Sequence, residues 1–167
     1  MRNKIIPRNQ IAELAADLRK RGQRIVFTNG CFDLLHLGHV RYIEEARSLG
    51  DILILGLNSD RSVREIKGPQ RPLTAEDDRA EVLAALECVS YVVLFNEPDP
   101  FRLIEAIKPH ILVKGADWPE EKIIGADLVR SYGGQVRRIQ LVPSISTTKL
   151  IQRIVGRYQG LFSEKGE

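Results

Sequence analysis

Short apolar runs alternate along this chain with stretches in which apolar residues recur every three or four positions. The short runs are typical of buried parallel strands and predict strands at 24–28, 51–57, 90–95, 111–113 and 135–142. The longer stretches have the spacing of amphipathic helices and predict helices at about 11–18, 36–49, 60–66, 74–87, 99–108, 125–132 and 146–158. Because strand and helix alternate throughout, we expect an α/β fold: a single Rossmann-like, doubly wound parallel sheet of about five strands with helices on both faces.

Glycine, proline and capping residues set the limits of these elements. Gly50 closes one helix, Pro109 stops another, and Thr74 with Asp77 three residues on predicts an N-cap. No repeat or interdomain linker interrupts the pattern. We therefore predict one domain over 1–167, with an N-terminal helix in 1–23, a Rossmann-like core over 24–142, a C-terminal helix in 143–160 and a frayed tail at 161–167.

Composition narrows the class of protein. The formal net charge is +3 and basic residues are interleaved with acidic ones, so we expect no nucleic-acid partner and a pocket for a small polyanion instead. Cys31 and Cys88 lack ligand spacing, which argues against a disulfide scaffold or structural zinc. No signal-peptide pattern or membrane-length apolar run occurs, so we expect a cytoplasmic protein without a membrane partner.

Polar residues gather directly after successive predicted strands, at 28–39, 58–61, 114–117 and 144–148. In open α/β sheets, ligands bind beyond the carboxyl ends of the strands, where the strand order reverses. We therefore expect these clusters to form one binding site along one edge of the sheet.

Two histidines in the first of these clusters are suited to binding a phosphoryl group. His36 and His39 are separated by Leu37-Gly38, so they share a face of a first helical turn. The free backbone N–H groups and the dipole of that turn favour an anion, and two imidazoles can donate hydrogen bonds to a phosphoryl group during displacement. No third ligand lies nearby, so no protein metal site is predicted.

Cations and hydroxyls supply further phosphate-binding groups. Lys67 and Arg71 lie on a Gly/Pro loop that can close over a triphosphate, and Arg79 is either a third such cation or a partner of Glu76 or Asp78. The sequence Ser146-Thr147-Thr148 opens the last helix, with Ser146 as its N-cap, and forms a second site for phosphates.

The loop after the fourth strand carries side chains suited to a sugar. Lys114 stands at the carboxyl end of that strand, and Asp117 can accept hydrogen bonds from sugar hydroxyls. Trp118 either packs beside the ligand or covers the core. Three common motifs are missing: GxGxxG of dinucleotide-binding folds, the Walker A sequence of P-loop NTPases, and GxSxG of α/β-hydrolases.

The chain resembles the HxGH nucleotidyltransferases of the cytidylyltransferase-like superfamily over about 24–154, and within it the D-glycero-β-D-manno-heptose 1-phosphate adenylyltransferases. The residues that carry the resemblance are Thr-Asn-Gly-Cys-Phe-Asp at 28–33, His-Leu-Gly-His at 36–39, Leu-Gly-Asp at 49–51, Asn-Ser-Asp at 58–60, Lys-Gly at 67–68, Arg-Pro at 71–72, Val-Lys-Gly-Ala-Asp at 113–117 and Ser-Thr-Thr at 146–148.

The resemblance implies transfer of AMP from ATP to a heptose 1-phosphate, with Mg²⁺, giving ADP-heptose for lipopolysaccharide and pyrophosphate. It also implies a homodimer and a separate sugar kinase that acts before this step. We expect direct in-line displacement, because the acceptor phosphate is already an anion.

The site residues predicted on this basis fall into three groups. The catalytic residues are His36, His39, Lys67 and Thr147. The nucleotide-binding residues are Thr28, Asn29, Gly30, Cys31, Phe32, His36, Gly38, His39, Asn58, Asp60, Arg71, Lys114, Gly115, Ser146, Thr147 and Thr148. The substrate-binding residues are Asp33, Lys67, Lys114 and Asp117.

Two alternatives stay open at this point. One is a cytidylyltransferase that acts on glycerol 3-phosphate or a related alcohol phosphate. The other is a non-catalytic nucleotide- or tRNA-binding module, since class I tRNA synthetases share this fold and a related histidine motif. The second alternative predicts nucleotide binding without release of pyrophosphate.

Overall fold

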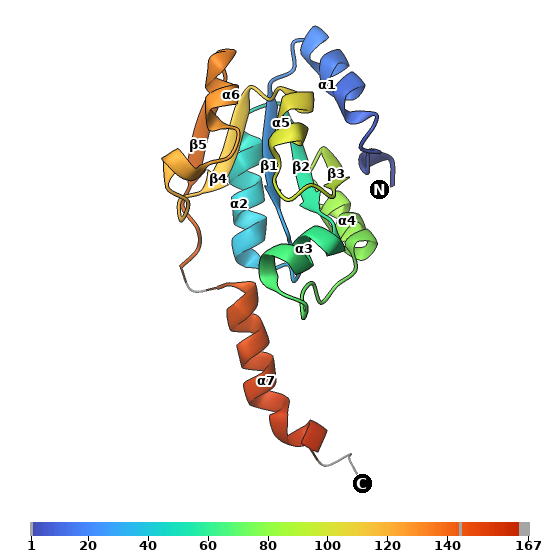
Figure 1. Ribbon diagram of the computed structural model, residues 1–167, viewed down its shortest axis with the longest axis vertical. Helices are drawn as coiled ribbons and strands as arrows, with labels where there is room; N and C mark the ends of the chain where they lie inside the picture. The colour runs from blue at the N-terminus through green and yellow to red at the C-terminus, as the bar shows by residue number, and fades with distance from the viewer. Residues whose placement is uncertain (1, 144, 164–167) are drawn as a thin grey trace.

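A computed structural model describes residues 2–143 and 145–163; residue 144 of the last predicted polar cluster and residues 164–167 of the predicted tail lie outside it. Five parallel strands form one sheet in the order β3-β2-β1-β4-β5 (Figure 1). The predicted α/β fold class is confirmed. The strands are β1 (Ile25–Gly30), β2 (Ile52–Asn58), β3 (Tyr91–Phe95), β4 (Ile111–Gly115) and β5 (Gln135–Ile139).

Helices cover both faces of the sheet, and two separate hydrophobic clusters lie between the layers. One cluster joins the sheet to α2 and α4, and the other joins its opposite face to α1, α5 and α6. The α-helices are α1 (Ile11–Lys20), α2 (Leu37–Ser48), α3 (Asp60–Lys67), α4 (Glu76–Ala85), α5 (Phe101–Ile107), α6 (Ala126–Ser131) and α7 (Thr147–Ser163); short 3₁₀ turns are η1 (Arg2–Lys4) and η2 (Glu120–Lys122).

The central strand shows why the apolar runs of the sequence are continuous. Val26 packs into the cluster under α2, whereas Ile25 and Phe27 pack into the cluster under α1 and α5. All three are fully buried. A strand that is covered on both faces has no solvated side, so both sets of alternating positions are apolar.

The strand order places the polar loops together. β1 pairs with β2 on one side and with β4 on the other. The connection after β1 leads through α2 to β2, whereas the connection after β4 leads through α6 to β5 on the other side, so the two run in opposite directions. This is the point at which ligands bind in open α/β sheets. The loop after β1 leads directly into α2, whose first turn therefore stands at the centre of this edge (Figure 1).

Several predicted limits are wrong. α4 begins at Glu76 after Ala75, with no side-chain cap, so Thr74 is not its N-cap. β5 ends at Ile139 rather than at 142, because its pairing partner β4 ends at Gly115 opposite that residue. α7 continues to Ser163, so 161–163 belong to the helix rather than to a frayed tail.

The N-terminal segment adds a contact that the sequence pattern did not predict. Ile5 forms a parallel bridge with Val92 at the outer side of β3, and the amide of Ile6 donates to the Val92 carbonyl over 2.8 Å. Lys4 Nζ donates to the carbonyls of Leu86 and Val89 at 3.0 and 2.7 Å. This segment therefore lies along the β3 edge of the sheet.

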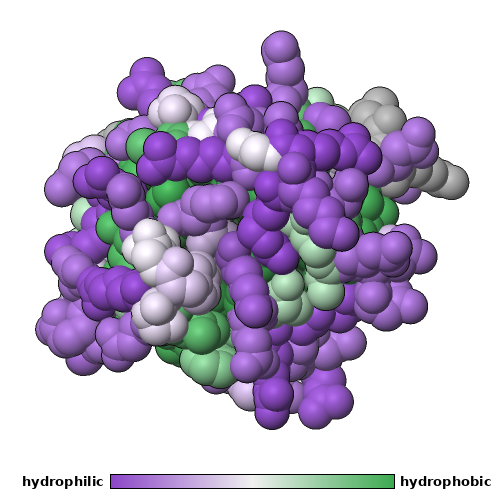
Figure 2. Space-filling view, turned by 90° about the horizontal axis from the view of Figure 1, so that it is seen from above, coloured by the Kyte–Doolittle hydropathy of each residue, from purple (hydrophilic) through white to green (hydrophobic). Residues whose placement is uncertain are grey.

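The remaining surface is mainly polar. Figure 2 shows the molecule from above, and hydrophilic side chains cover most of that face, with the hydrophobic colour confined to areas between them. At the opposite end α7 extends away from the sheet (Figure 1), and Ile154, Val155 and Tyr158 on it are about half exposed. Among the described helices, none has both the length and the apolar character needed to cross a bilayer.

Candidate active site

A cavity of about 580 Å³ opens at the carboxyl edge of the sheet. Its walls come from the loops after all five strands and from the segment between α3 and α4. This volume lies within the range of small-molecule sites, about 300–1,000 Å³. The predicted polar loops therefore lie together at one edge of the sheet, as expected.

Two histidines stand at the N-terminus of α2 in the centre of the cavity. His36 is the N-cap, in extended conformation, and its Nδ1 accepts from the His39 amide at 3.3 Å. The two rings are stacked, with centroids 3.8 Å apart and an interplanar angle of 16°. A Cβ at Gly38 would lie 3.1 Å from the His36 ring and 3.2 Å from Ile145, so glycine lets the segment before α7 approach the pair.

Both imidazoles are neutral at neutral pH. Burial lowers the pKa of His36. Burial, and then the neighbouring charge of His36, lower the pKa of His39 to about 4. Each ring therefore offers an N–H donor rather than a cation, which suits hydrogen bonding to a phosphoryl oxygen.

The turn before α2 holds an aromatic ring against His39. Phe32 has a φ of 45°, a left-handed conformation that costs a residue with a Cβ about 1–2 kcal/mol. Its ring meets His39 edge-on, with centroids 5.3 Å apart. A Cβ at Gly30 would lie 2.9 Å from the Phe32 ring, so the glycine two residues earlier is required by this packing.

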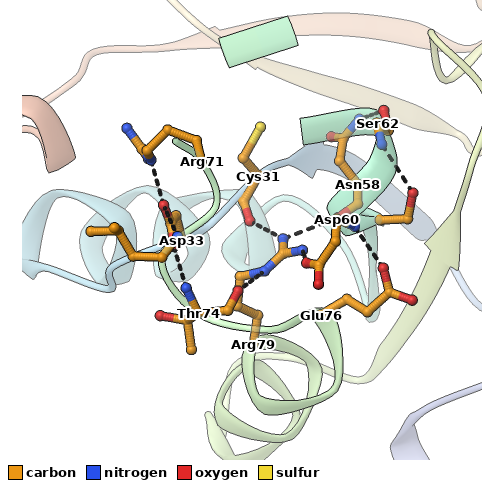
Figure 3. A network of polar contacts seen from close by, with 11 residues as sticks. Cys31, Asp33, Asn58, Asp60, Ser62, Arg71, Thr74, Glu76 and Arg79 are labelled. Atoms are coloured by element: carbon orange, nitrogen blue, oxygen red, sulfur yellow. Dashed lines mark hydrogen bonds and ion pairs between the residues drawn. The ribbon is translucent and has the colours of Figure 1, made fainter. Parts of the chain in front are cut away.

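Asp33 holds the segment that carries Arg71. Its carboxylate accepts from Arg71 Nε at 2.5 Å and from the amides of Leu73 and Thr74 at 2.8 and 3.0 Å (Figure 3). Burial alone would raise the pKa of Asp33, but these hydrogen bonds outweigh it and hold the pKa below its usual range. The Asp33 side chain is 0% exposed, and its hydrogen bonds here go to Arg71 and to these two amides, while the residue lines the cavity wall.

Arg79 occupies the interior of the same wall, 2% exposed. It forms an ion pair with Asp60 at 2.7 Å and donates to three backbone carbonyls (Figure 3). The expected roles of Arg79, as a cation over the phosphates or as a partner of Glu76 or Asp78, are therefore wrong. Glu76 instead accepts the amide of Asp60 at 2.6 Å.

Lys114 is the fourth residue of β4 and lines the cavity. Its amine donates to Asn29 Oδ1 and so ties β4 to the last turn-facing residues of β1. Burial lowers the pKa of Lys114 to about 8, and Asp117 nearby opposes that shift. Trp118 is 48% exposed and lines the cavity, so it does not cover the core.

The first turn of α7 completes the wall. Ser146 Oγ accepts from the Lys149 amide at 3.2 Å, which confirms the predicted N-cap. Thr147 and Thr148 line the cavity at this helix N-terminus. Their hydroxyls and amides are available to an anion.

Two predicted nucleotide-binding residues do not line the cavity. Thr28 is fully buried, and its hydroxyl bonds to that of Tyr42 at 2.6 Å, while Asp60 is turned to Arg79. The other predicted residues do line it: Asn29, Gly30, Cys31, Phe32, Asp33, His36, Gly38, His39, Asn58, Lys67, Arg71, Lys114, Gly115, Asp117, Ser146, Thr147 and Thr148.

Sequence reasoning missed a further part of the wall. Asp99 and its neighbours Pro98 and Pro100 follow β3 and line the cavity beside the β2 loop. The rule that ligands bind after the strands would have found this loop, since it follows a predicted strand. Within the described residues, no group of three or more His, Cys, Asp or Glu side chains is placed to hold a metal ion.

Comparison with known proteins agrees with this fold. Residues 27–153 match the family model described as cytidylyltransferase-like, and the chain belongs to this family. It is 55% identical over 156 residues to the bifunctional protein HldE of Pelobacter propionicus, and 54% identical over 157 residues to that of Syntrophotalea carbinolica. These matches cover 93% and 94% of this chain and 32% of each relative, so the chain spans about a third of the length of the curated relatives it matches.

Solved structures give the same picture. The lipopolysaccharide core biosynthesis protein of Thermoplasma volcanium is 29% identical with a TM-score of 0.59, over 72% of this chain and 98% of that one. The pantoate-beta-alanine ligase of Francisella tularensis has a TM-score of 0.62 at 17% identity, over 87% of this chain and 74% of that one. The second likeness supports the fold alone.

Proposed function

We propose that this protein transfers AMP from ATP to a sugar 1-phosphate, and that the acceptor is a heptose 1-phosphate. The observation that carries the proposal is the stacked pair of neutral histidines at the N-terminus of α2, inside a cavity that a second helix N-terminus also lines. The likeness to bifunctional HldE proteins and to a lipopolysaccharide core biosynthesis protein supports the choice of heptose.

The reaction needs no covalent intermediate with the protein. A phosphate oxygen of the acceptor forms a bond to the α-phosphorus of ATP, and the bond from that phosphorus to pyrophosphate breaks. His36 and His39 donate hydrogen bonds to the α-phosphate oxygens, whose charge grows in the transition state. Because no proton has to be removed from the acceptor, the protein supplies position and charge stabilisation.

In-line displacement requires acceptor and leaving group on opposite sides of the α-phosphorus. Thr147 and Thr148, at the N-terminus of α7, hold the pyrophosphate. Lys67 and Arg71, on the β2 side of the sheet, hold the phosphate of the acceptor, which replaces the nucleotide contact expected for Arg71 from the sequence, and their charge limits repulsion between the two anions. This arrangement gives Lys67 and Thr147 separate tasks on the two sides of the histidine pair.

The two wings of the cavity differ in chemistry. Trp118 and Leu141 belong to the wing after β4 and β5, where apolar surface suits the base, with Asp117 for the ribose. Asp99 lies in the wing after β2 and β3, with Lys67. One Asp99 carboxylate oxygen accepts from the Phe101 amide, which leaves the other to bind hydroxyls of the acceptor.

Mg²⁺ is proposed to enter with ATP. The carboxylates of Asp33 and Asp60 are held by arginines, but Asp117 and the hydroxyls of Ser146 and Thr147 are oxygen donors in the cavity wall. This sparse donor set fits Mg²⁺, which takes most of its ligands from substrate phosphates and water. When bound, the ion neutralises phosphate charge.

Release of pyrophosphate tests the proposal. The protein is incubated with ATP or CTP and with heptose 1-phosphate or glycerol 3-phosphate, and the nucleotide product is identified by mass spectrometry. We expect ADP-heptose from ATP and heptose 1-phosphate at a rate well above the other combinations. Turnover only with CTP and glycerol 3-phosphate would establish the cytidylyltransferase alternative, and nucleotide binding without pyrophosphate would establish the non-catalytic one.

The same proposal bears on the cellular location of the reaction, the enzyme that supplies its acceptor and the oligomeric state. ATP and a phosphorylated sugar are cytoplasmic substrates, so we place the reaction in the cytoplasm. A sugar kinase that makes the acceptor and a homodimeric assembly stay predictions from the family resemblance. Size-exclusion chromatography with light scattering on the purified protein measures its molar mass and so tests the predicted homodimer.

A further inference from the structure

We propose that Arg79 is a positioning residue for His39, which it holds in place through the Cys31 carbonyl and the Phe32 ring. This inference rests on the proposed function, because the task of His39 is to bind the reacting phosphate. Arg79 itself does not line the cavity, so it acts on the site only through its neighbours.

The guanidinium of Arg79 joins four separate segments (Figure 3). Nη1 donates to the carbonyls of Cys31 and Asn58 at 2.5 and 3.0 Å, and Nε donates to that of Thr74 at 2.9 Å. Nη2 pairs with Asp60 at 2.7 Å. These partners are the β1 loop, the end of β2, the segment before α4 and the first residue of α3.

The planar fork of an arginine is needed for such a set. A lysine amine is a single point of charge, and it cannot reach the separate acceptors that lie around the edge of a guanidinium plane. Arg79 is 2% exposed, so water cannot replace a missing donor at these carbonyls. Residue 79 therefore has to be an arginine, because a lysine would supply the positive charge but not the donors in these directions.

The Cys31 carbonyl connects this fork to the histidines. The next residue, Phe32, has its φ at 45°, so its ring direction depends on how the preceding peptide is held. The Phe32 ring is 6% exposed and meets His39 edge-on at 5.3 Å. A rotation of the peptide between Cys31 and Phe32 moves the ring, and the support of His39 is lost with it.

If Arg79 served only to join α3 to α4, its hydrogen bond to the Cys31 carbonyl in the turn before α2 would not be required. Two of its contacts, to Thr74 and Asp60, fasten α3 and α4 to one another, and Glu76 adds a further bond to the Asp60 amide. The contact to Cys31 goes to neither of these helices, because Cys31 lies in the loop after β1. It reaches the one turn that carries both Phe32 and the start of the histidine motif.

The experiment combines Arg79→Lys, Phe32→Leu and the double variant. We expect each single change to lower kcat by about 100-fold with little change in KM for ATP, the loss typical of a small displacement of catalytic groups. The double variant loses no more than the worse single variant, because both changes break the same chain of contacts. Losses that multiply in the double variant would overturn the inference.

The titration of His39 gives a readout that stability alone does not move. NMR of the His39 ring in Arg79→Lys should show its pKa rising from about 4 toward 6.5, since release of Phe32 admits water to the ring. Besides burial, the charge that His36 acquires on protonation also lowers the His39 pKa, and His36 is unchanged in the variant. A reduced kcat with an unaltered His39 pKa would contradict positioning and leave Arg79 a structural residue.

Matched variants separate this inference from folding and from the proposed function. Arg21→Lys makes the same change at an exposed ion pair with Asp17 on α1 and should leave kcat and the His39 pKa unchanged. If Arg79→Lys fails to fold, Asp60→Asn removes the counter-charge alone and should give the same pattern to a smaller degree; unchanged kcat and pKa there would refute the inference. A wild-type protein without transferase activity would refute the function, while the His39 titration would still decide the inference.

Discussion

Asp33→Asn tests whether the carboxylate is a support for Arg71 or a ligand for substrate. The amide oxygen that replaces Oδ1 can still accept from Leu73 and Thr74, whose amides lie at 2.8 and 3.0 Å. The amide NH₂, however, faces Arg71 Nε across 2.5 Å, so donor meets donor. One charge-assisted bond in a buried setting is lost, which is worth about 1.5–3 kcal/mol.

The side chains are 0% and 17% exposed, so solvent screens this pair little and the full loss applies. We therefore expect the free energy of unfolding to fall by about 2–3 kcal/mol, and Tm to fall by roughly 5–10 °C for a domain of this size. Urea denaturation followed by far-UV circular dichroism measures the change. Asp127→Asn, at a fully exposed residue paired with Arg130, is the control and should leave stability unchanged.

The pH dependence has a definite sign. The pKa of folded Asp33 lies below the unfolded value of about 3.9, so its contribution is present in full above that pH and disappears as the pH falls through the folded pKa. The difference between wild type and Asp33→Asn should therefore be constant near neutrality and shrink below about pH 4. A variant as stable as the Asp127→Asn control, or a difference that persists undiminished in acid, would refute the reasoning.

Three further predictions concern the reaction. His39→Ala should lower kcat by about 10²–10³ while the Kd for ATP changes far less, and near-normal turnover by pyrophosphate release would contradict its role. Above a pH of about 8 the amine of Lys114 loses its proton, so kcat/KM for ATP should fall there, and Lys114→Met should lack this limb of the pH profile. Asp99→Asn should raise KM for the sugar 1-phosphate about 2–10-fold and leave KM for ATP unchanged; equal effects on both would place Asp99 outside the acceptor wing.

The parts of this fold that the sequence predicts are those with a local signal. Apolar runs between turn residues located the strands β1 to β4, because a strand buried on both faces needs apolar residues at most positions. The histidine pair was found because its spacing and its place at the start of a helix are both visible in the chain. The structure adds that His36 is the N-cap of α2, whose first helical residue is Leu37.

The parts that were missed depend on partners far away in the chain. Arg79 lies in a helix next to three acidic residues, where a solvated ion pair is the ordinary expectation, yet three of its acceptors are carbonyls, which have no sequence signature. Thr74 has the residue type of an N-cap, but its amide is taken by Asp33, and the helix begins two residues later. Such outcomes are decided by tertiary contacts rather than by local preference.

The bridge between Ile5 and Val92 has a consequence for handling the protein. Outermost strands expose rows of free amide and carbonyl groups that recruit strands from other molecules. On the β3 edge the N-terminal segment occupies the backbone groups at Val92, whereas the β5 edge carries exposed Arg137 and Arg138, whose charge repels a second copy. Deleting the residues before Pro7 would expose the β3 edge but not change the β5 edge. We therefore expect the truncated protein to aggregate through β3.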